Sequence, residues 1–229
     1  MTIIAVSGLM REARIAAGPG VRTLAGGGNA ALLLQRLERA IAEGARGIIS
    51  FGIAGGLAPS LKPGDCVVAS EVRDGGACFI PDAAWTARIL AKLPQAIHAP
   101  VAGADAIATT TAEKAALFGA TGACAVDMES HIVARAARAH GLAFAVLRTI
   151  SDAADSALPP LVSVAVTDKG TLNLPGVLGS LLANPRQLAV LPRTARESNA
   201  AFAALLRCRR ALGLRLLGPD AGELALDMG

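Results

Sequence analysis

Short apolar runs alternate with helical patterns from residue 2 to about residue 152, and this alternation constrains the fold more than any other feature. Runs such as TIIAVSG at 2–8 and LAFAVLRTISD at 142–152 are mostly apolar, which is typical of strands buried on both faces. The segment 29–44 spaces its leucines for one helix face, with Asn29 as a predicted N-cap and Gly44 at the end. The alternation predicts an α/β fold with a mainly parallel sheet.

The rest of the chain is interpreted in the same way. We expect further strands at 21–28, 46–56, 62–72, near 97–103 and at 123–128, with 46–56 running into a glycine loop. Helices are expected from Pro81, from Thr111 and up to His140, and helical patterns dominate after 152. No internal repeat or long linker is present, so residues 1–229 are predicted to form a single domain with a basic helical part from about 173.

Composition argues against several classes of protein. Apolar residues make up 53 % and aromatics 3 %, so a sizeable core must be filled by small aliphatic side chains. No run of about 18 uncharged apolar residues is present, and the N-terminus lacks a basic start and a cleavage site, so we expect a cytoplasmic protein. The cysteines form no C-x-x-C pair and the histidines share no ligand spacing, so no metal is expected.

Polar residues gather where the predicted strands end. In open α/β sheets, ligands bind beyond the carboxyl ends of the strands. The sequence places polar or small residues at five such ends, namely Gly8–Glu12, Ser50–Gly56, Asp105, Asp127–Glu129 and Arg148–Asp152. The pattern predicts a ligand site at this edge of the sheet.

The glycine-rich stretches do not make this a dinucleotide or P-loop site. GIAGGL at 52–57 lacks two of the three glycines of the dinucleotide pattern, and G-x-x-x-x-G-K-[ST] does not occur. A nicotinamide-dependent dehydrogenase is therefore disfavoured. The glycines at 50–56 are either a tight turn or a place where backbone N–H groups approach a ligand closely.

VDMES at 126–130 and RTISD at 148–152 hold the side chains best suited to catalysis or ligand binding. Glu129, near the start of a helix, is placed to accept hydrogen bonds from two neighbouring hydroxyls, as in a sugar diol, beside the apolar surface of Met128. The alternative is structural: Asp127 and Asp152 would cap helices, and Arg148 would neutralise an acid.

Six short stretches occur in a fixed order along the first part of the chain, namely SGLMRE near the start, SFGIAGG at 50, LKPGD at 61, GADAI at 103, VDME at 126 and RTISD at 148. Together they resemble the purine nucleoside phosphorylase / methylthioadenosine nucleosidase superfamily and cover roughly residues 1 to 160. The stretch 173–198 is similar to the hopanoid-biosynthesis-associated branch. The resemblance implies a central mixed, mostly parallel twisted sheet flanked by helices, and cleavage of an N-glycosidic bond to a purine.

The same resemblance implies roles for individual residues. Asp152 would give a proton or hydrogen bond to purine N7, so it should be protonated when it acts, and Ser151 would orient it. Glu129 would hold the ribose hydroxyls, with Met128 against the sugar and Arg148 near the nucleophile. The base slot maps to Ala106, Ile107 and Ala108, and the sugar and nucleophile side to Gly8, Ser50, Gly52 and Ala54.

The sequence does not decide whether water or phosphate attacks the sugar. In related hydrolases a first-loop glutamate helps place a water; Glu12 is available here, but Ala13 replaces an acid often found one position later. Arg11, Arg14 and Arg148 would instead cradle inorganic phosphate, as co-substrate of a phosphorylase, unless the first-loop arginines are only surface charge. The arginines favour a phosphorylase slightly, and no other cofactor is expected.

The C-terminal part is basic, with seven arginines against Glu197 alone in 186–216. The branch resemblance implies adenine release from adenosylhopane, a lipid-linked purine nucleoside. The helix expected at 194–213 has an apolar stripe that would either rest on a membrane or pack on the domain, made of Phe202, Leu205, Leu206 and Leu212.

The expected partner is a second copy of the chain, and two other functions remain as alternatives. A homo-oligomer is expected because relatives assemble as dimers to hexamers, and no nucleic-acid partner is expected. The alternatives are a methylthioadenosine/adenosylhomocysteine-type nucleosidase and a non-catalytic nucleoside- or lipid-binding protein.

Overall fold

The computed structural model describes residues 2–164, 167, 173, 179–180, 182–184 and 188–219. The strands are β1 (Thr2–Ser7), β2 (Val21–Ala25), β3 (Ala45–Gly56), β4 (Cys66–Asp74), β5 (Ala77–Phe79), β6 (Ile97–Gly103), β7 (Ala125–Asp127) and β8 (Ala143–Asp152). The helices are α1 (Met10–Ala16), α2 (Ala30–Ala42), α3 (Ala83–Lys92), α4 (Thr111–Thr121), α5 (Ser130–His140), α6 (Leu161–Val164), α8 (Leu191–Leu212) and the 3-10 helix η2 (Leu214–Leu217).

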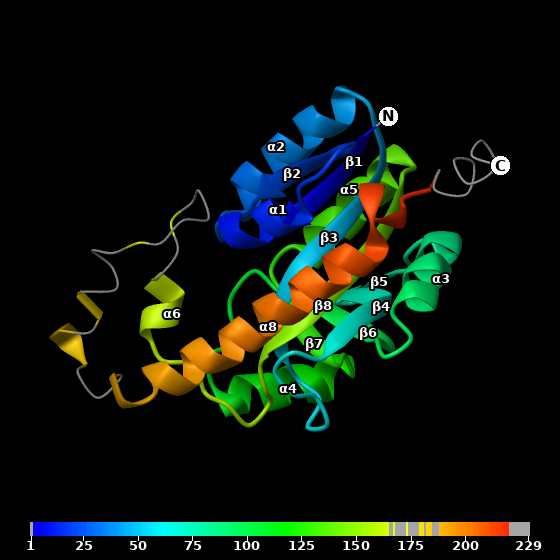
Figure 1. Cartoon of the computed structure of the whole chain (residues 1–229). Coiled ribbons are helices and arrows are strands. Elements are labelled where there is room, and N and C mark those ends of the chain that lie inside the picture. The colour runs from blue at the N-terminus through cyan, green and yellow to red at the C-terminus, as the bar shows by residue number, and fades with distance from the viewer. Residues whose placement is uncertain are drawn as a thin grey trace.

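The sheet is mixed, and its centre is parallel. Strand β1 pairs in parallel with β2 and β3, and β3 pairs in parallel with β8 along most of its length. Strand β8 meets β4 antiparallel, β4 and β6 run parallel, and β7 joins β6 to the far end of β3. The predicted single-domain fold with a mixed, mostly parallel sheet flanked by helices is confirmed (Figure 1).

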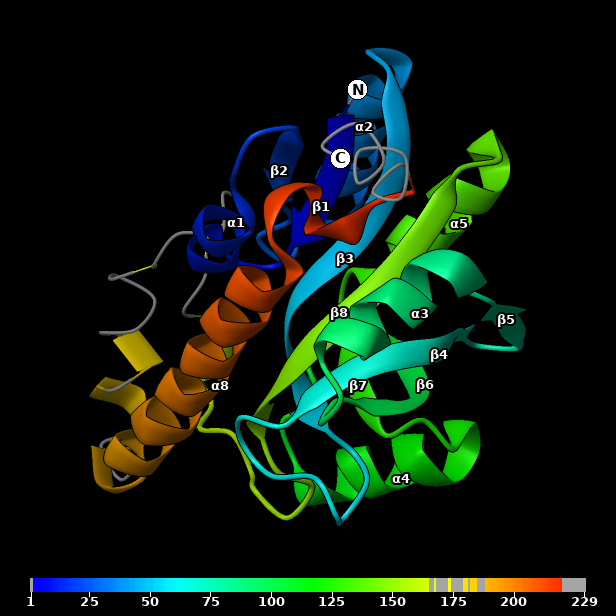
Figure 2. The ribbon, with the colours of Figure 1, turned by 45° about the vertical axis from the view of Figure 1, so that its right-hand side comes forward.

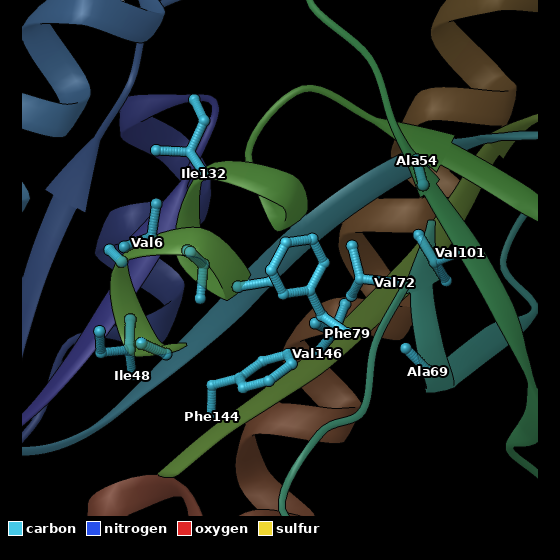
Figure 3. Packing of buried hydrophobic residues seen from close by; sticks show 14 of the residues in the cluster. Val6, Ile48, Ala54, Ala69, Val72, Phe79, Val101, Ile132, Phe144 and Val146 are labelled. Carbon is cyan, nitrogen blue, oxygen red and sulfur yellow. The ribbon is translucent and has the colours of Figure 1, made fainter. Parts of the chain in front are cut away.

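Helices cover both faces of the sheet. Helix α8 runs along β3 and β8 on one face, with α1 and α3 beside it (Figure 2). Helices α2 and α5 cover the other face. Because side chains alternate along a strand, Ile48 packs toward α2 and α5 whereas Ile49 packs toward α8. Figure 3 shows part of the first of these two cores, with Val6 and Ile48 from the strands and Ile132 from α5.

The observed elements differ from the predicted ones in three places. The glycines of 52–56 are not a loop after the strand, because β3 continues through Gly56 and pairs with β7 and β8. The short strand β5 was not predicted, since its three residues carry no usable periodicity. The helix expected from Pro81 begins at Ala83, because Asp82 accepts a hydrogen bond from the Trp85 N–H at 2.7 Å and acts as the N-cap.

The apolar stripe of α8 packs on the domain. Phe202, Leu205 and Leu212 are buried, and Leu206 is 38 % exposed. The packed interpretation of this helix is therefore confirmed, and these three side chains are not available to a membrane. Among the described helices, none is both long and apolar enough to cross a bilayer. Most of 165–187, including much of the stretch that resembles the hopanoid branch, lies outside the described residues.

Candidate active site

A cavity of about 580 Å³ opens where six strands end, namely the five that the sequence predicts and β2. Its wall combines the segments after β1, β2 and β6, the end of β3, the β7–α5 junction and the end of β8. Ten of the thirteen predicted site residues line it: Gly8, Glu12, Ala54, Ala106, Ile107, Ala108, Met128, Glu129, Ser151 and Asp152. The other lining residues are Leu9, Gly27, Gly28, Ile53, Gly55, Val126, Asp127, Leu158 and Val162.

Glu12 is held in the cavity wall by two backbone groups. It lies in the first turn of α1, where Oε2 accepts a hydrogen bond from the Leu9 N–H at 2.6 Å. Its Oε1 accepts one from the Ile53 N–H, at 2.7 Å, on β3. The side chain is 1 % exposed, and this burial raises the pKa of Glu12, although Arg148 and the backbone N–H groups oppose the rise. A raised pKa suits a group that takes a proton near neutral pH.

Arg148 lies behind the cavity wall and does not line it. Its side chain is fully buried, its Nη2 donates to Ser50 Oγ, and Nη2 also lies 3.3 Å from Glu129 Oε2. Its Nε lies 3.0 Å from Asp127 Oδ2, although the geometry is not that of a hydrogen bond. Arg148 thus acts as the countercharge for buried carboxyl groups. Ser50 and Gly52, which were also predicted site residues, lie with it behind the wall.

At the β7–α5 junction, Asp127 caps the start of a helix and Glu129 lines the cavity. Asp127 Oδ1 accepts hydrogen bonds from the Glu129 N–H at 2.8 Å and the Ser130 N–H at 2.7 Å, so Asp127 caps the helix start. Glu129 is the residue before α5 and not in its first turn, and its side chain faces the cavity. Burial raises the pKa of Glu129 to about 8; Asp127 and Glu12 add to this and Arg148 opposes it.

Asp152 has a partner that the sequence analysis missed. Its Oδ2 forms an ion pair with Nζ of Lys114, from α4, and its Oδ1 lies 2.5 Å from Ser151 Oγ. Both Asp152 and Lys114 are buried, at 4 % and 0 % exposure. The sequence gives no local signal for this pair, because a single lysine in a helix is normally a solvated one.

The arginines of the first loop are not at the cavity. Arg11 stacks over the ring of Phe202 at 3.9 Å, and its Nη1 donates to Asn199 Oδ1 at 3.4 Å. Arg14 is exposed in part at the end of α1, and neither arginine lines the cavity. No lysine or arginine occurs among the described residues that line the cavity, whereas Glu12, Asp127, Glu129 and Asp152 all do.

The remaining wall is apolar. Ala106, Ile107 and Ala108 follow β6 and form one side, and Ile107 is 38 % exposed. Met128 lies beside Glu129 at the β7–α5 junction. Leu158 and Val162, near α6, extend the apolar wall beyond the stretches that the sequence analysis singled out. The described wall of the cavity thus combines four carboxyl groups with apolar side chains.

Solved structures with a similar fold include nucleosidases. The Helicobacter pylori 5′-methylthioadenosine/S-adenosylhomocysteine nucleosidase superposes with a TM-score of 0.61 at 16 % identity, over 91 % of this chain and 97 % of that one. The futalosine hydrolase of the same organism gives 0.59 at 18 %, covering 90 % and 97 %. The nucleosidase of Colwellia psychrerythraea, solved with adenine, gives 0.59 at 20 %, covering 80 % and 95 %. This chain therefore has a nucleosidase fold.

The family follows from the sequence match. A model of the phosphorylase superfamily matches residues 6–174, and the chain belongs to that superfamily. No curated protein sequence matches the chain. The predicted membership is confirmed, whereas the hopanoid branch stays a prediction.

Proposed function

We propose that this protein hydrolyses the N-glycosidic bond of a purine nucleoside, with water and not phosphate as the nucleophile. The observation that carries the proposal is the lack of a basic side chain in the described lining of the cavity, which holds four carboxyl side chains. A phosphate dianion would find no cation there, and Arg148, behind the wall, is already engaged by Asp127 and Glu129.

Glu12 is the group that activates the water. Both of its oxygens accept backbone N–H groups, so the carboxylate is fixed, and each oxygen keeps a second lone pair for the water. As the C1′–N9 bond breaks, its electron pair passes to the purine, and the water oxygen bonds to C1′. The water proton passes to Glu12, whose raised pKa favours that transfer.

Asp152 serves the leaving group on the opposite side. A proton given to purine N7 neutralises the charge that the base acquires when the bond breaks. Ser151, whose Oγ lies 2.5 Å from Asp152 Oδ1 and 3.1 Å from the Ala54 carbonyl oxygen, fixes the orientation of that carboxyl group. Release of the purine and exchange of protons with solvent return Glu12 and Asp152 to their starting states.

Glu129 and Met128 hold the sugar. Glu129 is buried beside Gly8, where a Cβ would lie only 2.9 Å from Glu129 Oε1, so the glycine leaves room for the carboxyl group at the ribose diol. Met128 supplies apolar contact for the face of the ring.

The substrate is a 5′-substituted adenosine with an apolar substituent. Leu9, Leu158 and Val162 supply the apolar rim for that substituent. The likeness of 173–198 to the hopanoid-associated branch favours adenosylhopane, and the structural neighbours favour methylthioadenosine or adenosylhomocysteine.

The deciding experiment is a product assay on adenosine, methylthioadenosine and a 5′-alkyl adenosine, with and without inorganic phosphate. We expect adenine and a free pentose in both buffers, and incorporation of ¹⁸O from labelled water at C1′. A pentose 1-phosphate that forms only with phosphate would show a phosphorylase instead. Binding of these nucleosides without adenine release would show a non-catalytic binding protein.

A further inference from the structure

Lys114 is a buried lysine to which the proposed hydrolysis assigns no role. It lies on α4 between Glu113 and Ala115, which are both exposed, yet its own side chain is 0 % exposed. Lysine is almost never fully buried unless it is paired, because removing an ammonium from water is costly. The position of this side chain therefore needs an explanation in terms of its partners.

Three acceptors surround the ammonium. Nζ of Lys114 contacts Asp152 Oδ2, and it donates to the carbonyl oxygens of Ala153 at 2.8 Å and Ser156 at 2.7 Å. An ammonium has three N–H donors, so this set uses all of them. Lys114 is thereby fixed in one orientation, and it fixes the carboxyl group of Asp152 and the segment that follows β8.

The other charged groups near the pair are engaged elsewhere. On α4, Glu113 caps its own helix through the N–H groups of Thr109 and Thr110. On the outer side, Arg193 of α8 pairs with Glu197, contacts Ser156 Oγ and interacts with Asp155. Across the cavity, Arg148 holds Asp127 and Glu129. Among the described ion pairs, Asp152 is paired with Lys114.

We infer that Lys114 is a positioning residue for departure of the purine, which rests on the function proposed above. It holds Asp152 toward the base, and it stabilises the carboxylate that remains when the Asp152 proton has passed to N7. In that step the C1′–N9 electron pair goes to the purine, the carboxyl proton goes to N7, and the ammonium keeps its charge. The ion pair therefore strengthens as the leaving group departs.

The test is Lys114→Met, assayed for steady-state adenine release. Because a charge-assisted bond is lost, we expect kcat to fall about 10- to 100-fold while KM changes less than about threefold. A role limited to anchoring the segment after β8 predicts the same loss with and without the Asp152 carboxyl group, which a double-variant cycle measures.

A double-variant cycle separates the two roles. If Lys114 acts through Asp152, then Lys114→Met lowers kcat little further in an Asp152→Asn background, and Lys114→Arg recovers part of the wild-type rate. The matched control is Arg193→Met, which removes a contact to Ser156 in the same segment and should keep the wild-type kcat. Should Lys114→Met fail to fold, Lys114→Gln removes the charge and keeps two donors, and the same loss of kcat is expected.

The outcomes also separate this inference from the proposed function. Wild-type protein that releases no purine from any nucleoside contradicts the function itself. If the wild-type protein turns over but the losses from the Lys114 and Asp152 variants are fully independent in the cycle, only the role of Lys114 is overturned.

Discussion

Glu12 and Arg148 approach each other over Gly52, which has no side chain to separate them. A Cβ at Gly52 would lie 2.7 Å from Glu12 Oε1 and 2.7 Å from Arg148 Nη1. This approach brings α1 to the centre of the sheet, because Glu12 lies on α1 and Gly52 lies on β3 opposite Arg148 of β8. The lack of a side chain at Gly52 therefore leaves room for both Glu12 and Arg148.

Gly52→Ala should displace Glu12 from the cavity wall. A shift of about 1 Å at a catalytic group can cost about 10²-fold in rate, so we expect a fall of that size in kcat. The measurement is steady-state adenine release. Gly119→Ala is the control, since a Cβ there meets nothing within 4 Å and the exposed helical site should gain about 0.5–1 kcal/mol of stability.

Glu12→Gln should lower kcat about 10²- to 10⁴-fold with a smaller change in KM, because the amide cannot take a proton from water. Single-turnover assays with a nucleoside of the preferred class measure the effect. Glu38→Gln serves as the comparison, because Glu38 pairs with His140 and does not line the cavity, and it should keep the wild-type rate. A Glu12 variant with unaltered kcat would remove this residue from the mechanism.

Arg148→Met should lower the free energy of unfolding. The variant leaves the buried carboxyl groups of Asp127 and Glu129 without their countercharge, and breaking such a buried pair typically costs about 3–5 kcal/mol. Urea unfolding followed by circular dichroism measures the loss. The exposed Arg207→Met should change the free energy of unfolding by less than about 0.5 kcal/mol.

Stability should fall as pH rises from about 5 to about 8. Burial raises the pKa of Glu129 from its usual 4.5 to about 8, so in this window the folded protein keeps a proton that the unfolded chain has released. The folded state then binds more protons than the unfolded state, and raising the pH favours unfolding. Burial of Glu12 acts in the same direction.

Glu129→Gln isolates that effect, because the amide does not titrate. Its free energy of unfolding, measured in urea at pH 5 and pH 8, should fall less over this interval than that of the wild type. Equal slopes for the two proteins would show that Glu129 is ionised in the folded state throughout. The Arg207→Met protein provides the slope expected when an exposed charge is removed.

The sequence by itself determined the class of fold and the edge of the sheet that holds the site. Periodicity is local, so the apolar runs at 2–8 and 142–152 and the helix at 29–44 could be located without knowing what they pack against. Parallel strands bring their carboxyl ends to one edge, and this is why Glu12, Glu129 and Asp152 could be expected together.

Only the tertiary structure decided which charges face the cavity. Arg148 and Lys114 are ordinary basic residues in the sequence, and both become fully buried countercharges behind the wall. Lys114 meets Asp152 across 38 positions of the chain, and Arg11 turns instead toward Phe202. Burial and pairing at this range depend on how the helices pack on the sheet, which no local pattern specifies.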